Sequence, residues 1–322
     1  KDVLNNVNKF YKGQPQEIIE KIAKDFLKKD VVNNAEENVE STMNVIVPNL
    51  SPIAAMSWIK NRATTKDGYP FFLFSSFALN HLMFYDLGTI LSQTPINSEN
   101  PFIYGQGVGT SSGPSRLFTI HDYKIKNVED MSFIINKGYV GGMHSFYDVT
   151  QGKKADIHFD IHNDLYKNGS KLNKRQSDPL ISAGLKYDDK SLTEYQSRSI
   201  HNVYASKTFD QNNALTENSK IGDHKRRIVA NAMKLLLTKS PMEITVNGRE
   251  FIDGSANYAV GNNITVIFKS AQDDNPGTNI DKKLSGDYLI HSARHVFSKE
   301  KCYSILLISK IANYTSDDFP VG

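Results

Sequence analysis

The sequence predicts an α+β protein in which a mostly antiparallel β domain, crossed by one helix, follows a smaller domain of helices and a β-hairpin. Three observations lead to this prediction. The first third carries amphipathic helices and an aromatic hairpin, the second half places strands on both sides of one long amphipathic segment, and the chain closes on a long strand pair. A Gly- and Ser-rich stretch lies between, so we expect domains at 1–104 and 118–322 and a linker at 105–117.

Composition limits the classes of function. The 322 residues are enough for about two domains. The 38 Lys and Arg are mixed with 35 Asp and Glu, which indicates neither specific nucleic-acid recognition nor membrane binding as the main role. The most apolar stretch, 69–91, contains too many polar residues to span a membrane. The single cysteine, Cys302, excludes a disulfide or a thiolate metal cluster within one chain.

Two helices are predicted near the N-terminus. Residues 16–29 have apolar side chains at spacings of three and four, which is typical of one buried helical stripe. After a short strand at 45–48, Ser51 is a candidate N-cap and Pro52 a candidate first helical residue. The residues of this second helical region expected to face inward are Ala54, Ala55, Trp58, Ile59 and Ala63.

An aromatic β-hairpin is predicted next, with arms at 71–74 and 82–85 and a short helical piece at 86–92. The apolar faces of helix and hairpin must cover one another, so we expect one shared core and no ligand pocket. Its expected members are Trp58, Phe71, Phe72, Phe74 and Phe84.

The second part is predicted as strands around one helix. Gly141-Gly142 marks a bend or a close backbone approach, and the polar residues 162–207 are expected to form a surface insertion. The expected elements are an extended piece at 119–126, a short helix at 128–137, strands at 138–150 and 153–161, a helix at 224–239 behind an N-cap at Gly222-Asp223, and strands at 242–246 and 263–268.

The chain closes on a predicted antiparallel hairpin of 285–297 and 302–310. Period-two alternation over the first arm assigns its residues to two faces. We expect Tyr288, Ile290, Ser292 and Arg294 on one face and Leu289, His291, Ala293 and His295 on the other.

Five motifs in this order resemble the central baseplate hub proteins of contractile-tailed bacteriophages, the tail-tube-like or VgrG-like hub family. They are Ile18-Ile19-x-x-Ile22, Ser51 to Ile59 with Ala63, Gly68 to Phe74, Phe84 to Leu87, and Gly286-x-Tyr288-x-Ile290 with His295-x-Phe297. The resemblance implies a tail-tube-like β domain. It also implies a first tube-like domain ahead of Gln16, which we expect to lie outside the printed sequence or to be supplied differently.

The resemblance further implies a structural part: a homotrimer that joins a threefold central spike to the hexameric tail tube. Its expected partners are further copies of itself, the spike protein, the tail tube or tube-initiator ring proteins and the tape-measure protein. Its expected place is the virion tail baseplate, assembled in the host cytoplasm. The residues expected to be architectural in the closing hairpin are Gly286, Tyr288, His295 and Phe297. A hub or spike part of a secretion-type contractile injection system and a tail-associated glycan- or peptidoglycan-degrading enzyme remain alternatives.

Candidate chemistry is sparse. His158, Asp160 and His162 alternate and could ligate a metal, but an exposed strand face with their apolar neighbours inward is the favoured interpretation. The Asp pairs at 188–189, 273–274 and 317–318 lie in polar loop sequence, where general acid-base chemistry lacks partly buried partners. No nucleophile or metalloprotease motif occurs. We therefore expect no catalytic residue, no metal and no cofactor.

Overall fold

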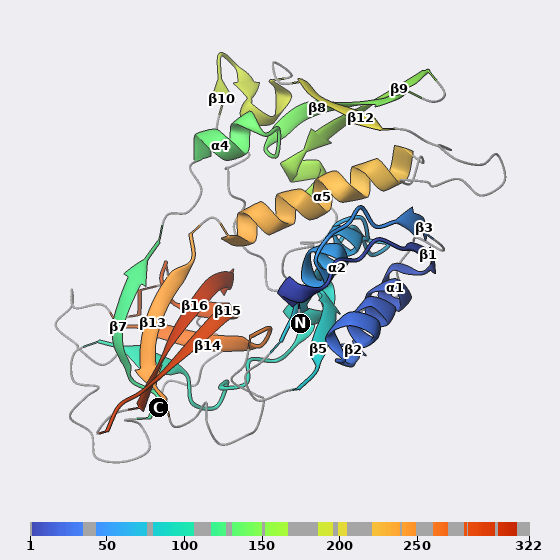
Figure 1. Cartoon of the computed structure of the whole chain (residues 1–322). Coiled ribbons are helices and arrows are strands. Elements are labelled where there is room, and N and C mark those ends of the chain that lie inside the picture. The colour runs from blue at the N-terminus through green and yellow to red at the C-terminus, as the bar shows by residue number, and fades with distance from the viewer. Residues whose placement is uncertain are drawn as a thin grey trace.

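The computed structural model describes residues 2–34, 43–75, 80–105, 117–126, 131–149, 152–166, 186–195, 199–204, 221–238, 240–248, 260–269, 280–281, 283–299 and 302–313. Three parts surround the long helix α5 (Ile221–Thr238): an N-terminal layer, an upper sheet and a barrel-like sheet (Figure 1). The predicted α+β class is confirmed. The predicted linker at 105–117 lies almost wholly outside the described residues.

The N-terminal layer begins with an antiparallel ribbon of β1 (Phe10–Gly13) and β3 (Met43–Ile46). Helix α1 (Pro15–Ile22) continues as a π-helical turn to Leu27, as the amphipathic pattern predicts. Helix α2 (Pro52–Lys60) begins at the predicted proline. The carboxylate of Asp2 caps it, because Asp2 Oδ1 accepts from the Ile53 backbone N–H at 2.7 Å and Oδ2 from Ser51 Oγ at 3.3 Å. Ser51 is the N-cap residue as predicted, but its side chain makes no capping hydrogen bond.

The aromatic hairpin is present as β4 (Phe71–Phe74) and β5 (Leu82–Asp86), paired antiparallel. The short strand β2 (Val31–Asn33) adds to β5 in parallel and completes a three-stranded sheet. Asp86 caps helix α3 (Leu87–Ser92) by accepting from the Thr89 N–H at 2.8 Å. The hairpin and the short helix after it are confirmed.

The upper sheet consists of β8 (Gly141–Asp148), β9 (Lys153–Asp160) and β12 (Ser199–Tyr204), with α4 (Met131–Asn136) at its side (Figure 1). Strand β9 is antiparallel and β12 parallel to β8. The predicted insertion at 162–207 thus contributes a sheet strand. A Cβ on Gly141 would lie 2.3 Å from the Thr193 carbonyl oxygen, so the expected close backbone approach is confirmed.

The barrel-like sheet has six strands, in the order β6-β14-β15-β16-β13-β7. Their bounds are β6 Phe102–Tyr104, β7 Ile120–Ile125, β13 Met242–Asn247, β14 Asn263–Phe268, β15 Gly286–Phe297 and β16 Cys302–Asn313. The edge strands approach each other, because Ile103 forms a parallel bridge with Thr119, immediately before β7. The Ile103 N–H donates to the Phe118 carbonyl at 2.9 Å. Side chains from all six strands fill the interior, including Phe102, Ile244, Val266, Tyr288 and Leu306.

Helix α5 lies between the upper sheet and the other two parts (Figure 1). Its buried stripe joins a central cluster with Leu87 of α3, Phe159 of β9, Leu289 of β15 and Ile311 of β16. The helix begins at Ile221, one residue before Gly222, so the predicted N-cap at Gly222-Asp223 is wrong. The central cluster brings residues of the first third of the chain together with residues of the last strands.

Candidate functional site

Four of the residues that were predicted to have an architectural role lie in the closing hairpin β15–β16. Gly286 has φ +147, and a Cβ there would lie 2.1 Å from the Ala312 carbonyl oxygen, so only glycine has room. Tyr288 is buried in the barrel, and its hydroxyl donates to the Leu284 carbonyl at 2.5 Å. Burial raises the pKa of the Tyr288 hydroxyl. These contacts favour a packing role for both residues.

His295 and Phe297 lie further along the same arm. His295 Nδ1 lies 2.7 Å from Ser304 Oγ on the facing strand, and partial burial lowers the pKa of this histidine. Phe297 is 60% exposed. The Phe297 ring therefore contributes less buried apolar area to the fold than the ring of Tyr288.

A β-bulge at His291 changes the faces of the hairpin. Ile290 pairs with Ile308 and Ser292 with Leu307, which leaves His291 as the extra residue. Before the bulge Tyr288 and Ile290 contact the barrel interior, whereas after it Ala293 does. The prediction that Ser292 and Arg294 share a face with Tyr288 and Ile290 is wrong, because the bulge reverses the alternation.

His291 itself is a half-buried histidine whose Nε2 has no hydrogen-bond partner within the described part of the chain. Burial lowers its pKa to about 4, so the imidazole is neutral near pH 7. The period-two pattern of the first arm gave no sign of the bulge that positions this residue.

The five aromatic residues expected to share one core divide between two. Phe71 and Phe84 are buried in the N-terminal cluster and stack with centroids 4.9 Å apart. Trp58 is half-buried against the same cluster, with the Arg62 guanidinium 3.7 Å from its ring centroid. Phe72 and Phe74 pack against the central cluster instead, so a single shared core is wrong for these two.

The inward face of α2 also differs from the expectation. Ala55 and Ile59 are buried as predicted, but Ala54 is exposed and Met56 takes a buried position.

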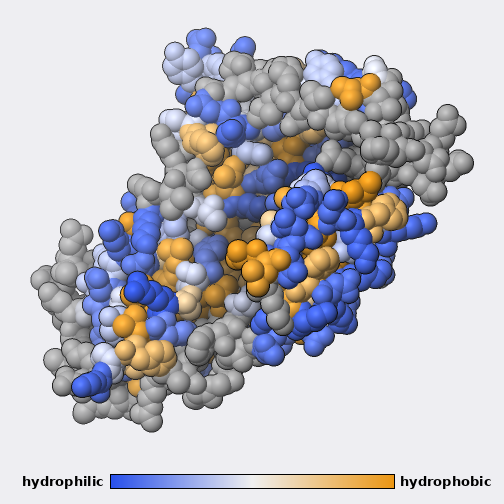
Figure 2. Space-filling model, viewed as in Figure 1, coloured by the Kyte–Doolittle hydropathy of each residue, from blue (hydrophilic) through white to orange (hydrophobic). Residues whose placement is uncertain are grey.

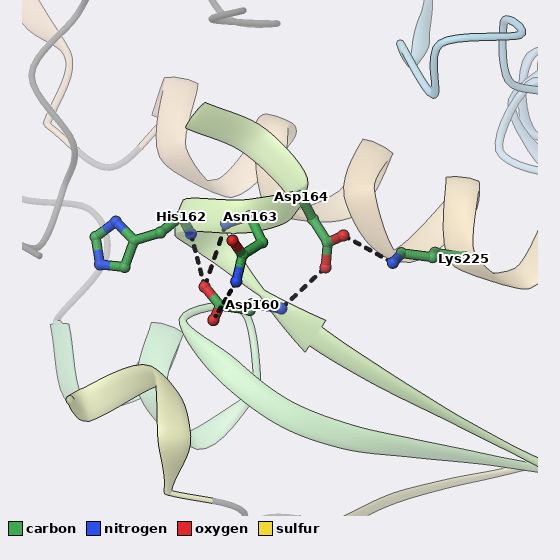
Figure 3. A network of polar contacts seen from close by, with 5 residues as sticks. All are labelled: Asp160, His162, Asn163, Asp164 and Lys225. Carbon is green, nitrogen blue, oxygen red and sulfur yellow. Dashed lines mark hydrogen bonds and ion pairs between the residues drawn. The ribbon is translucent and has the colours of Figure 1, made fainter. Parts of the chain in front are cut away.

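Asp160, the last residue of β9, belongs to a turn-capping network with His162, Asn163 and Asp164 (Figure 3). Asp160 Oδ1 accepts from the His162 N–H at 2.8 Å, and its Oδ2 accepts from Asn163 Nδ2 at 3.0 Å. Asp164 Oδ2 accepts from the Asp160 N–H at 3.0 Å, and its Oδ1 pairs with Lys225 Nζ at 2.7 Å. The carboxylates therefore fasten β9 to α5.

This network does not assemble a metal site. The His162 imidazole points away from both carboxylates (Figure 3), and His158 is exposed on the strand. Within the described ranges, no three His, Cys, Asp or Glu side chains gather as ligands for one ion. His158 is exposed and Asp160 half-buried, while Ile157, Phe159 and Ile161 are buried, so the predicted amphipathic face is confirmed.

The remaining carboxylate pair that the structure describes is Asp188-Asp189. Both residues have positive φ, 49° and 58°, and form the exposed turn between the short strands β10 (Lys186–Tyr187) and β11 (Lys190–Ser191). The other two pairs, at 273–274 and 317–318, lie outside the described residues. In the part of the chain that is described, no helix is long and apolar enough to cross a membrane.

Two polar features were missed by the sequence interpretation. Asn97 exchanges two hydrogen bonds with the backbone of Thr265, and the Thr265 hydroxyl donates to Asp287 Oδ1 at 2.7 Å. Lys234 of α5 donates from Nζ to Oδ1 of Asn61, the C-cap residue of α2, at 3.4 Å. Both features join residues far apart in the chain, so no local motif marks them.

Comparison with known proteins supports a shared fold. No family model and no curated protein matches the chain. Solved structures match nearly all of it. The tail protein from Neisseria meningitidis MC58 matches with a TM-score of 0.51 and 16% identity over 98% of this chain and 72% of its own. The prophage MuSo2 43 kDa tail protein from Shewanella oneidensis matches with a TM-score of 0.51 and 12% identity over 96% of this chain and 68% of its own.

The chain shares the fold of phage tail proteins. The expected structural resemblance to this class is confirmed at that level. At 16% and 12% identity the similarity is one of fold, and it assigns no role to individual residues.

Proposed function

We propose that this chain is a structural component of a phage tail baseplate, the trimeric hub that joins the central spike to the hexameric tail tube. The observation that carries the proposal is the nearly closed six-stranded barrel within a fold shared along almost the whole chain with tail proteins. The order of hub-like motifs from Ile18 to Phe297 supports the same assignment.

Exposed apolar side chains support the proposal that this chain contacts other proteins. Phe10 and Ile46 face each other across β1 and β3 and are 54% and 47% exposed. Phe297 is exposed at the end of the closing hairpin. Clustered apolar exposure of this kind is typical of interaction surfaces. We propose that these two places contact neighbouring subunits or tail proteins in the virion.

A purely structural role is part of the proposal. The candidate catalytic or metal-binding groups that the structure describes are engaged in turns and caps, as for Asp160 and Asp164. Symmetry supplies the reason for a trimer, since a threefold spike and a sixfold tube need an adaptor whose copies number three. Further copies of this chain, the spike, the tube or tube-initiator ring and the tape-measure protein are the proposed partners.

The oligomeric state of the full-length chain tests the proposal. We expect sedimentation and native mass measurements to give a trimer, alone or with the spike protein, and particle class averages to show threefold symmetry. Phe297→Ala and Phe10→Ser are expected to weaken the trimer while leaving the unfolding midpoint unchanged, with exposed His158→Ala as the matched control. A chain that stays monomeric at micromolar concentration with the spike present contradicts the hub assignment.

A further inference from the structure

Strand β16 carries apolar side chains on both faces of the barrel-like sheet. Leu306 and Ile308 fill the barrel interior. Tyr303, Ile305 and Leu307 alternate with them along the strand and therefore point away from the interior. These three side chains are half-buried but belong to none of the three apolar clusters that the described residues form. The sheet thus carries an apolar stripe outside every described core.

The neighbouring strands extend this stripe into a wider surface, which we call the outer sheet face. Strand register assigns its members, because cross-strand partners point to the same side of a sheet. They are Ser292, Arg294 and Val296 of β15, Tyr303, Ile305 and Leu307 of β16, Glu243, Thr245 and Asn247 of β13, and Asp122 and Lys124 of β7. The apolar stripe therefore has charged side chains on both sides of it.

The middle row of the outer sheet face has opposite charges at its two ends. Successive cross-strand partners make up this row: Arg294, Ile305, Thr245 and Asp122. Arg294 and Asp122 are exposed, and within the described residues neither forms an ion pair. In the row beside it, Glu243 pairs with Lys126, and Lys124 is exposed. The middle row thus presents an unpaired cation on the β15 side and an unpaired anion on the β7 side.

Helix α5 covers one end of this side of the sheet. There Leu289 and Ile311 join the central cluster with residues of α5. Strands β7, β13, β15 and β16 continue away from α5 (Figure 1). On the side of the molecule that Figure 2 shows, the lower left part of the surface, where these strands lie, carries apolar side chains among hydrophilic ones. The half-buried state of Ile305 and Leu307 means that the stripe beyond α5 is still in contact with solvent.

We propose that the outer sheet face packs against the same face of a second copy of the chain, with the two β16 stripes in contact. A two-fold axis parallel to β16 sets the β15 side of one copy opposite the β13 and β7 side of the other. Arg294 of each copy then faces the side that carries Asp122 of the second copy, so the same attraction occurs twice. Opposite charges on the two sides make the face complementary to itself.

The size of the face sets the strength of the pairing. Four strands and the rows at Tyr303, Ile305 and Leu307 cover roughly 400 Å² of sheet per copy, from the strand spacing and the rise per residue. A stable complex buries about 800 Å² per partner. We therefore expect a weak pair that forms at high protein concentration and dissociates on dilution.

This two-fold pairing is independent of the threefold contact proposed for the hub. The two contacts together would give six copies, whereas the pairing alone gives two. The test therefore depends on which variants associate and not on one total mass.

Charge reversal tests the pairing by sedimentation velocity of the full-length chain at concentrations up to about 1 mM, where weak complexes form. Arg294→Asp and Asp122→Arg each set like charges against one another twice. Each variant alone is expected to pair at least about tenfold more weakly than the wild type. An equimolar mixture of the two variants is expected to pair again, because both contacts of the mixed pair join an acid to a base.

Two controls separate this pattern from effects on folding and on the hub contact. Lys21→Glu reverses an exposed charge on α1 and is expected to pair like the wild type. Unfolding midpoints of all variants are expected to match, since the changed side chains are exposed. Single variants that pair as strongly as the wild type, or a mixture that does not regain pairing, overturn the proposed face. A trimer without this charge pattern refutes the pairing alone, and the pattern without a trimer refutes the hub assignment alone.

Discussion

The side-chain amide of Asn97 pairs with the backbone of Thr265 as a neighbouring strand would. Asn97 Nδ2 donates to the Thr265 carbonyl at 2.9 Å, and the Thr265 N–H donates to Asn97 Oδ1 at 2.7 Å. Strand β6 reaches β14 only from Val266 onward, so the amide extends the ladder by one residue where β6 has not yet begun. Both residues are buried. Without Asn97, the N–H and the carbonyl of Thr265 would therefore have no water molecule to form a hydrogen bond with.

Asn97→Ala is expected to lower the free energy of unfolding by about 1 to 3 kcal/mol, because it leaves a buried N–H and a buried carbonyl unpaired. Urea unfolding followed by circular dichroism measures this. Exposed Asn100→Ala is the matched control and is expected to change little. Equal stability of the two variants would show that the amide pairing contributes nothing.

Tyr288 and Phe297, on the same arm, are expected to behave oppositely. Tyr288→Ala removes a buried ring and is expected to cost about 3 to 5 kcal/mol, while Tyr288→Phe removes the hydrogen bond to Leu284 and costs about 1 kcal/mol. Phe297→Ala is expected to stay within about 0.5 kcal/mol, because the ring is exposed. Chemical unfolding of the three variants measures these values, and a large loss for Phe297→Ala contradicts the separation between folding and assembly.

Asp160→Ala is expected to destabilise the chain by about 0.5 to 2 kcal/mol, because Asp160 accepts from the backbone N–H that begins the turn after β9. Thermal unfolding is the measurement. His158→Ala, two residues earlier and exposed, is the control and is expected to be neutral. If both substitutions are neutral, the capping network of Figure 3 has no energetic role.

The stability of the chain is expected to depend on pH through His291. Its pKa is about 4 in the folded chain, against 6.5 when unperturbed, so between these values the unfolded chain binds more protons. The contribution of His291 to the free energy of unfolding is fully present above pH 6.5 and is lost as the pH decreases toward 4. The expected loss is on the order of 1 to 3 kcal/mol.

Unfolding curves from pH 7 to pH 4.5 for the wild type and His291→Leu isolate this contribution. The variant is expected to lose less stability on acidification than the wild type. His121→Leu, at an exposed position of β7, is the control and is expected to keep the wild-type slope. Identical slopes for all three proteins would exclude His291 as the source.

Local patterns explain how much of the fold could be predicted. The π-extended helix α1, the hairpin β4–β5 and the strand pair β15–β16 follow from periodicity within about a dozen residues. Strands β2 and β6 were missed, because each is three residues long and pairs in parallel with a strand distant in the sequence. The capping role of Asp2 at α2 was missed for the same reason, since Asp2 is 49 residues from Ser51.

The candidate site was less predictable than the fold. The alternation of β15 was extrapolated through His291, but a bulge depends on the register with β16, which no single strand specifies. Phe72 and Phe74 were assigned to one core because a hairpin was expected to have one buried face. Strand β4 instead lies between the N-terminal cluster and the central cluster. The central cluster exists only because α5 packs there, and the sequence of the hairpin does not specify that.

The central cluster along α5 also determines whether the two halves of the chain can fold separately. Leu87 and Ile90 precede the Gly- and Ser-rich stretch, while Ile228, Leu289 and Ile311 follow it, yet all belong to one apolar core. Each half alone would expose its share of that core to water, so two separately produced halves are expected to aggregate. Co-produced, they should associate into one complex and unfold in a single cooperative transition.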